Sequence, residues 1–173
     1  MSDPVEPELP ASPRDRLMAW LLVLVQFILI ALIVLLPGSS TWTLLVLVAR
    51  AVQVAEWVGI IVMVVAALAL GRGLTAAPLP NAHAELRTGG LYRFVRHPIY
   101  SGLLLFAVAR TLGSGSLWTG LACVALVVLI NAKARWEEQH LAQRFAGYVG
   151  YAASTPRFIP GWPPATPARR ASR

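Results

Sequence analysis

The sequence contains few charged residues. Asp, Glu, Lys and Arg make up 13% of its 173 residues, whereas soluble domains carry about 25%. Hydrophobic residues make up 57%, and the mean hydropathy is +0.63. A chain of this length buries only roughly two-thirds of its surface on folding, so it cannot hide this much apolar surface inside itself. The scarcity of charge therefore excludes an ordinary soluble domain and favours a protein that is surrounded by lipid.

Cysteine is also scarce. Cys123 is the single cysteine and lies within an apolar run, so an internal disulfide is excluded. No metal-ligand spacing involves this residue, and we expect it to be a small buried side chain. The sequence therefore predicts no metal site.

The few charges are mostly basic, with a formal net charge of +7. Such an excess can indicate nucleic-acid binding, but here the basic residues flank apolar runs. That arrangement is typical of membrane topology and of contact with anionic lipid headgroups. We therefore expect the bilayer, and no nucleic acid, as a partner.

Four apolar segments follow a proline-rich, acidic stretch of 13 residues. They cover residues 17–36, 43–70, 98–112 and 117–134. The first is long enough, at ~30 Å as a helix, to cross the bilayer core. The third would span only ~22 Å, so we expect it to form a tilted hairpin with the fourth. The pattern predicts an all-α integral membrane protein with about four transmembrane helices, a C-terminal helical hairpin and a cytoplasmic cofactor site.

The second apolar segment carries three polar residues at helical spacing, namely Arg50, Gln53 and Glu56. They can share one face of a helix, and two interpretations of that face remain open. It can turn toward the bundle, where Arg50 and Glu56 would be close enough to interact. Alternatively, the long side chains can reach the outer interface of the membrane.

The basic residues are distributed asymmetrically around the predicted helices. Thirteen of the fifteen fall on one side of the predicted membrane, and the exceptions are Arg50 and Arg110. Because loops rich in Lys and Arg stay in the cytoplasm, we expect both termini to be cytoplasmic. A bacterial inner membrane is the expected location.

Two dense polar clusters, at residues 92–100 and 133–140, flank the predicted hairpin. An antiparallel hairpin would return them to the same membrane face. Arg96 and His97 would then lie at a helix N-terminus that begins with Pro98, where an anion is favoured. Glu137 and Glu138 would lie at the exit of the fourth helix, where a cationic partner would relieve their mutual repulsion. Taken singly, these residues could also be membrane anchors, a solvated face or a helix cap.

Residues 88–102, TGGLYRFVRHPIYSG, resemble the T-x-G-x-Y-R-x-x-R-H-P-x-Y-x-G signature of the isoprenylcysteine carboxyl methyltransferase and phospholipid methyltransferase superfamily. Residues 137–141 resemble the E-E-x-x-L element, and residues 142–145 and 155–160 resemble the closing A-x-R-F and P-R-F-I-P elements. The resemblance covers about residues 86–160. The family's F-G-x-x-Y-x-x-Y pattern is one residue shorter in this chain. The resemblance therefore does not extend to Tyr148 and Tyr151.

The resemblance implies S-adenosyl-L-methionine as the methyl donor, bound without a Rossmann domain; the sequence has no G-x-G-x-x-G after a strand. The cofactor-binding residues that it implies are Gly90, Leu91, Tyr92, Arg96, His97, Pro98, Tyr100, Glu137 and Glu138.

The expected substrate is a lipidic or prenyl-like acceptor. It would reach the site from the bilayer, through the apolar walls of the second, third and fourth helices. Arg135 or Arg144 could orient a carboxylate acceptor, and Glu138 could accept the proton lost by an amine. These three are the candidate catalytic residues, and the choice between carboxylate and amine remains open at this point.

The expected organisation has four parts: a disordered arm at 1–13, two transmembrane helices at 14–71, a methyltransferase core at 72–160 and a basic, proline-rich tail at 161–173. Two other functions remain open. One is an NADPH-dependent membrane reductase of the sterol reductase type, which has a loosely similar H-P-x-Y region. The other is a non-catalytic membrane accessory protein. The sequence gives no indication of the oligomeric state.

Overall fold

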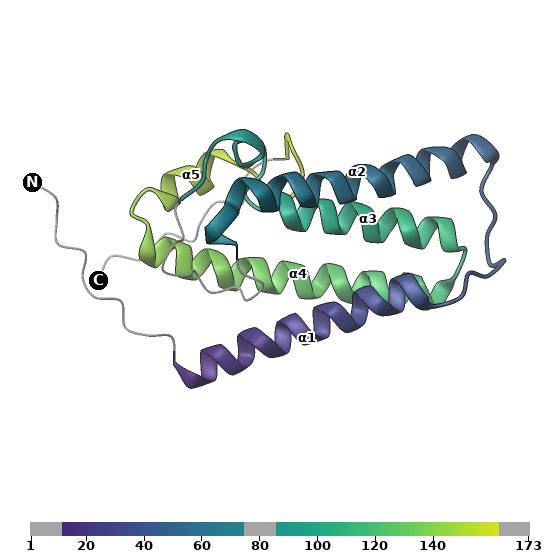
Figure 1. Ribbon diagram of the computed structural model, residues 1–173, viewed down its shortest axis with the longest axis horizontal. Helices are drawn as coiled ribbons and strands as arrows, with labels where there is room; N and C mark the ends of the chain where they lie inside the picture. Colours follow the sequence, from purple (N-terminus) through teal and green to yellow (C-terminus); the bar gives the residue numbers. More distant parts are fainter. Residues whose placement is uncertain (1–11, 75–85, 163–173) are drawn as a thin grey trace, which may run out of the picture.

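The computed structural model describes residues 12–74 and 86–162. The described residues form helices and contain no strand. The helices are α1 (Pro13–Leu35), α2 (Val46–Leu70), α3 (Pro98–Ser114), α4 (Leu117–Arg144) and α5 (Tyr148–Ser154), with the short 3-10 helices η1 (Gly71–Gly73) and η2 (Gly90–Arg93). The four long helices form an elongated bundle, and α5 lies at one end of it (Figure 1). The predicted all-α class is confirmed. The predicted N-terminal arm and C-terminal tail fall almost entirely outside the described residues.

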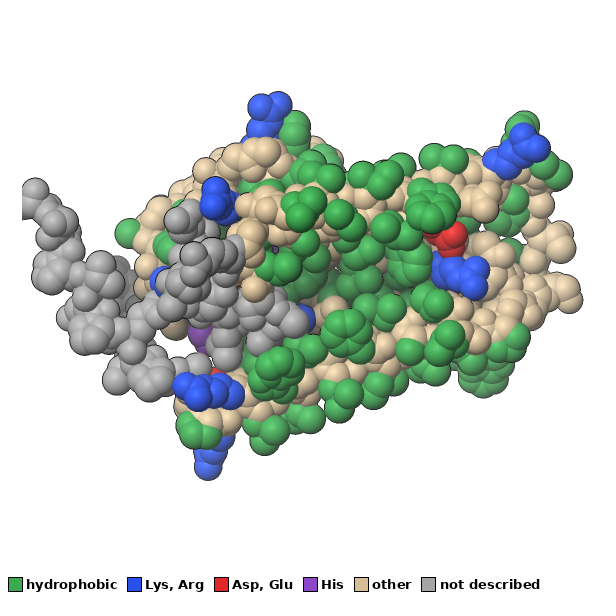
Figure 2. Space-filling view, viewed as in Figure 1, with side chains coloured by type: hydrophobic (Ala, Val, Ile, Leu, Met, Phe, Trp, Pro, Cys, Tyr) green, Lys and Arg blue, Asp and Glu red, His purple; other side chains and the backbone are tan. Residues whose placement is uncertain are grey.

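Three of the long helices, α1, α2 and α4, are long and apolar enough to cross a membrane. Helix α3 has 17 residues and therefore spans only ~25 Å, less than the ~30 Å of a bilayer core. Hydrophobic side chains cover the middle of the visible face, and charged side chains gather toward its two ends (Figure 2). Lipid can solvate such an apolar belt, as expected for an integral membrane protein.

Two helices end later than their apolar segments predicted. Helix α4 continues to Arg144, ten residues beyond the predicted end, because residues 135–144 contain good helix formers and neither Gly nor Pro. Glu137 and Glu138 therefore lie on a regular helix. Helix α3 continues to Ser114 and ends at Gly115, whose φ of +63° is left-handed. A Cβ at Gly115 would lie 2.3 Å from the Ser39 carbonyl oxygen, so a larger residue would not fit this turn.

Helices α2 and α3 approach each other closely through two glycines. A Cβ built on Gly59 would lie 2.7 Å from the Gly102 carbonyl oxygen, and one on Gly102 would lie 2.6 Å from the Gly59 carbonyl oxygen. Small residues at a crossing let two membrane helices pack backbone against backbone. This contact determines where α3 lies, and the polar cluster at residues 92–100 overlaps its start.

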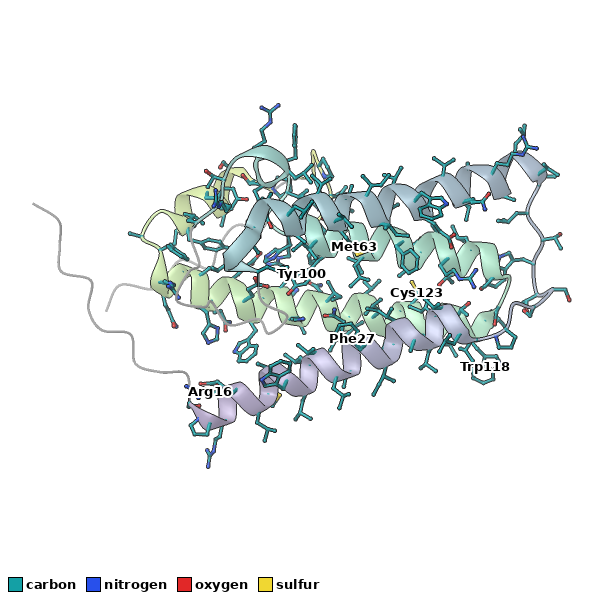
Figure 3. The ribbon with its side chains drawn as sticks, in the orientation of Figure 1. Arg16, Phe27, Met63, Tyr100, Trp118 and Cys123 are labelled. Carbon is teal, nitrogen blue, oxygen red and sulfur yellow. The ribbon has the colours of Figure 1, made fainter. Side chains whose placement is uncertain are left out.

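The bundle core lies between α1, α3 and α4. It is formed by seven buried residues: Ile33, Leu103, Ala107, Ala122, Cys123, Leu126 and Ile130. Cys123 is 6% exposed, which confirms the prediction that it is a buried side chain. Figure 3 labels Met63 and Cys123 among the side chains between the helices. Because this core lies in the middle of the bundle, both ends remain available for polar groups.

Candidate active site

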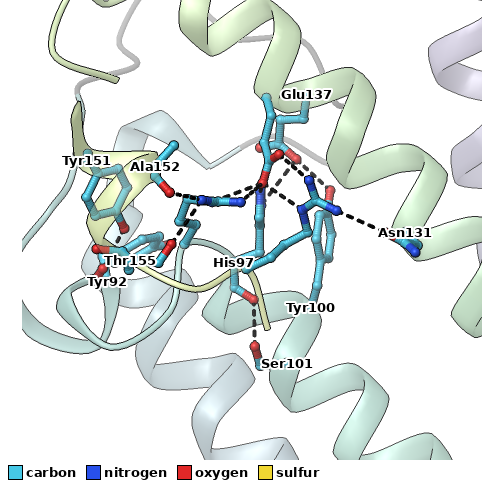
Figure 4. Close-up of polar contacts among 12 residues, drawn as sticks. Tyr92, His97, Tyr100, Ser101, Asn131, Glu137, Tyr151, Ala152 and Thr155 are labelled. Atoms are coloured by element: carbon cyan, nitrogen blue, oxygen red, sulfur yellow. Dashed lines mark hydrogen bonds and ion pairs between the residues drawn. The ribbon is translucent and has the colours of Figure 1, made fainter. Parts of the chain in front are cut away.

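The hairpin of α3 and α4 brings the two predicted polar clusters into contact. Arg96 Nε donates a hydrogen bond to Glu138 Oε1 over 3.1 Å, and His97 Nε2 lies 3.2 Å from the same oxygen. The segments at 92–100 and 133–140 are therefore neighbours at one end of the bundle, as predicted. Figure 4 shows these contacts.

A second arginine, Arg157, completes the surroundings of Glu138. Its Nε and Nη2 atoms donate to the two carboxylate oxygens over 2.8 Å and 2.6 Å. Its Nη1 atom donates to Asn131 Oδ1 over 3.1 Å. The hydrogen bond to Glu138 raises the pKa of Arg157. Sequence reasoning did not name Arg157 as a site residue, although it lies in the P-R-F-I-P element, which was the available signal.

Arg96 joins the start of α3 to the chain after α5. The residue is 5% exposed, and its Nη1 atom donates to the carbonyl oxygens of Ala152 and Thr155. Its backbone N–H donates to the Pro156 carbonyl oxygen over 2.8 Å. The anion beside Arg96 and His97 is thus Glu138 of the protein itself. His97 is the N-cap residue of α3, but its side chain makes no capping hydrogen bond.

Glu137 lies in different surroundings from its neighbour Glu138. Its Oε2 atom accepts a hydrogen bond from the Tyr100 hydroxyl over 2.9 Å and lies 3.8 Å from His97 Nδ1. The rings of His97 and Tyr100 are stacked, with their centroids 5.3 Å apart. Glu137 lines a cavity at this end of the bundle, and Glu138 does not.

This cavity has a volume of about 310 Å³ and receives side chains from all five α-helices. Most of its lining is apolar or aromatic. Its polar lining residues are Gln26, Arg87, Arg96, His97, Tyr92, Tyr100, Lys133, Glu137, Tyr148 and Tyr151. Figure 3 labels two lining residues, Phe27 of α1 and Tyr100 of α3. An apolar chamber with a few converging polar groups is the usual form of a small-molecule site.

Lys133 places a cation in the wall of this cavity. The residue is 2% exposed, its Nζ atom donates to Gln26 Oε1 over 2.7 Å, and Nζ lies 5.5 Å from the centre of the Tyr100 ring. Sequence reasoning did not place Lys133 or Gln26 in the site. The signal for Gln26 was that it alone interrupts the first apolar segment.

Three tyrosines form part of the wall beside α5. Tyr151 donates to the Tyr92 carbonyl oxygen, whereas the buried Tyr148 hydroxyl has no hydrogen-bond partner among the described residues. Burial raises the pKa of Tyr92 and of Tyr151 to about 12 and also raises the pKa of Tyr148. All three hydroxyls therefore stay protonated at neutral pH. The resemblance did not extend to Tyr148 and Tyr151, yet the fold places both in the cavity.

Of the remaining predicted site residues, Pro98 begins α3 and lines the cavity. The others do not line the cavity. Gly90, with φ +60°, and Leu91 lie in η2 and do not line it. Arg135 is exposed, and Arg144 lies over the Phe145 ring, 5.5 Å from its centre. Within residues 12–74 and 86–162, no three His, Cys, Asp or Glu side chains are grouped so that they could hold a metal ion.

Comparisons with known proteins identify the family of this chain. The sequence profile described as phospholipid methyltransferase matches residues 54–147, more than half of the chain. Protein-S-isoprenylcysteine O-methyltransferase B of Arabidopsis thaliana is 32% identical over 80 residues, which are 45% of this chain and 41% of that relative. The chain thus aligns with about two-fifths of the relative's length. No solved structure matches it. The chain belongs to the phospholipid methyltransferase family.

Proposed function

We propose that this protein is an S-adenosylmethionine-dependent methyltransferase that methylates a lipophilic carboxylate. The observation that carries the proposal is the charge arrangement of the cavity, where Glu137 and the buried Lys133 line one mostly apolar chamber bounded by membrane helices. Family membership supports methyl transfer. The name of the Arabidopsis relative, an O-methyltransferase, supports an oxygen acceptor.

The lining residues fit the chemistry of the donor. When bound, S-adenosylmethionine supplies an electrophilic methyl group on a sulfonium, and its transfer to a carboxylate oxygen breaks the carbon–sulfur bond and leaves a neutral thioether. Glu137 offers negative charge to a cationic ligand. The Tyr148 hydroxyl, which has no partner within the described part of the chain, offers a hydrogen bond, and Tyr92 and Tyr151 offer aromatic surface. Glu138 holds Arg96 and His97 in the cavity wall, so we assign it a positioning role.

Lys133 is the residue that we assign to the acceptor. An ammonium group in an apolar wall attracts an anion strongly because the local dielectric is low. Gln26 holds the ammonium in place, and Val23, Phe27 and Leu70 give the cavity apolar walls for a hydrocarbon chain. Arg135 and Arg144, named from the sequence for this role, do not line the cavity. An ionised carboxylate acceptor needs no general base, and Arg96, His97 and Arg157 already surround Glu138.

Catalysis by these residues would consist mainly of positioning. Holding two reactants in line converts a bimolecular step into an effectively unimolecular one and can supply roughly 7–11 kcal/mol. Glu137 and Lys133 lie on the same face of α4, four residues apart, so one rigid helix would orient both reactants.

Calorimetric titration of the detergent-purified protein with S-adenosylhomocysteine tests the donor half of the proposal. We expect Glu137→Gln to weaken binding about tenfold or more, because it removes a charge that faces the ligand. Tyr148→Phe should weaken binding less. The exposed Arg135→Gln is the matched control and should bind as the wild type does. Equal affinity in the wild type and Glu137→Gln would refute this donor site.

The chemical stability of the transferred methyl group tests the acceptor half. Membranes that contain the protein are incubated with isotopically methyl-labelled donor, and the lipid extract is treated with mild base. A methyl ester releases labelled methanol, whereas an N-methyl group keeps its label. We expect base-labile product, and a raised KM for the acceptor in Lys133→Met with unchanged affinity for S-adenosylhomocysteine. Base-stable label would show an amine acceptor and overturn the assignment.

A further inference from the structure

A second hollow lies at the opposite end of the bundle from the candidate active site. This groove, about 570 Å³ in volume, is lined by the connection after α1, the first half of α2 and the end of α3. On α2 it includes Arg50, whereas the active-site cavity includes Leu70. A helix rises ~1.5 Å per residue, so these positions are ~30 Å apart. The groove is therefore a separate site.

Charged and polar side chains of two helices face this groove. Arg50, Gln53 and Glu56 come from one side of α2, as their spacing predicted, and Arg110 comes from α3. Arg50 and Arg110 are also the two basic residues that the sequence places away from the cytoplasmic side. Figure 2 shows acidic and basic side chains close together near this end of the visible face.

Two of these charges have no partner within the described part of the chain. Arg110 Nη2 donates to the Val34 carbonyl oxygen over 3.3 Å. Among residues 12–74 and 86–162, neither Arg50 nor Glu56 forms an ion pair or hydrogen bond through its side chain. The interaction between Arg50 and Glu56 that their spacing allowed is thus absent. Charged side chains on membrane helices are unfavourable unless something pairs with them.

The groove lies at the depth expected for lipid headgroups. Trp42 lines it and donates its indole N–H to the Leu112 carbonyl oxygen over 2.9 Å. Trp118, at the start of α4 at the same end of the bundle, is 71% exposed (Figure 3). Tryptophans gather at membrane–water interfaces, where their rings lie at headgroup level. A lipid headgroup can therefore reach this groove.

We propose that the groove binds the headgroup of a zwitterionic phospholipid with a primary ammonium. Arg50, together with Arg110, complements the phosphate, and Glu56 complements the ammonium. An anionic lipid without an amine would leave Glu56 without a partner. A quaternary ammonium cannot donate a hydrogen bond to a carboxylate, so a choline headgroup fits less well. This proposal does not depend on the methyltransferase proposal, because it uses no residue of the active-site cavity.

Native mass spectrometry of the detergent-purified protein, titrated with single lipids, tests this proposal. The probes are dioleoyl phosphatidylethanolamine, phosphatidylcholine and phosphatidylglycerol. We expect the wild type to bind phosphatidylethanolamine about tenfold more tightly than the other two. Glu56→Gln should abolish that preference, and Arg50→Gln should weaken the binding of all three lipids. Because neither side chain has a partner among the described residues, both variants should fold.

Arg16→Gln is the matched control, since Arg16 is exposed at the far end of α1 (Figure 3), and it should bind lipids as the wild type does. Both groove variants should keep wild-type affinity for S-adenosylhomocysteine. Unchanged lipid selectivity in Glu56→Gln and unchanged affinity in Arg50→Gln would overturn the proposal. A loss of thermal stability in Glu56→Gln without any change in lipid binding would also overturn it, because Glu56 would then serve an internal ion pair.

Discussion

Glu137 and Glu138 are adjacent carboxylates on one helix, but they point in different directions. Successive residues of an α-helix are rotated by about 100°, so Glu138 faces Arg96, His97 and Arg157 while Glu137 faces the cavity. The first is surrounded by cations from distant parts of the chain. The second accepts a hydrogen bond from Tyr100. Their surroundings predict that one carboxylate stabilises the fold and the other contacts a ligand.

Neutralising each carboxylate separately tests this division. Glu138→Gln should lower the free energy of unfolding by roughly 3 kcal/mol, because it leaves the buried Arg96 guanidinium without its counter-ion. Glu137→Gln should change it by less than about 1 kcal/mol, since Glu137 lines an open cavity. Denaturant unfolding of the detergent-purified variants measures both values. Equal destabilisation by the two substitutions would contradict the division.

At the scale of elements, a close contact of two backbones in the bundle is the glycine crossing of α2 and α3. The backbones meet at Gly59 and Gly102, and Gly102 lies little more than one turn after His97. The position of the α3 start relative to α4 therefore depends on how closely α2 packs. Leu70, at the end of α2, lines the cavity. The crossing therefore also positions one wall of the cavity.

Gly102→Ala should weaken this crossing. The new Cβ would lie 2.6 Å from the Gly59 carbonyl oxygen and 2.9 Å from Met63 N, and these are backbone atoms that cannot move aside separately. We expect a loss of about 1–3 kcal/mol in the free energy of unfolding, as in other overpacked contacts, and weaker binding of S-adenosylhomocysteine. The helical Gly120→Ala is the control, since its Cβ would meet only Thr111 Cγ2, at 4.0 Å. A wild-type unfolding transition in Gly102→Ala would refute the close crossing.

At the scale of the whole molecule, charge is divided between two different ends. The candidate active site lies where η2, α5 and the end of α4 meet, and the groove with Arg50 and Glu56 lies at the other end. The excess of basic residues predicts that the active-site end faces the cytoplasm. In that orientation the connection after α1 would face the outside.

Cysteine labelling measures this orientation. The native Cys123 is buried and is replaced by alanine to remove background. Ser40→Cys, in the exposed connection between α1 and α2, should react with a membrane-impermeant maleimide in intact cells. Ser154→Cys, exposed at the end of α5, should react only after permeabilisation. The opposite pattern would show an inverted topology.

Most of the architecture could be predicted from local sequence. Length and apolar composition determine the membrane helices, because a helix satisfies its own backbone hydrogen bonds wherever lipid surrounds it. Pro98 begins α3 as predicted, and the short link between α3 and α4 forces a hairpin that joins residues 92–100 to 133–140. The family could also be identified, because its elements are short and local in sequence.

Only the tertiary structure showed that Gln26, Lys133, Tyr148 and Tyr151 share the cavity with the predicted site residues. Lys133 and Gln26 are 107 positions apart, and their contact depends on how α1 and α4 are rotated against each other. The fold of the chain after α4 likewise decides two further contacts. It brings Arg157 to Glu138, and it places Tyr148 in the cavity. The apolar pattern of the sequence determines the length of each helix and the side that faces lipid. Long-range packing determines how the helices are rotated and shifted against one another. That rotation and shift determine which side chains meet in the site.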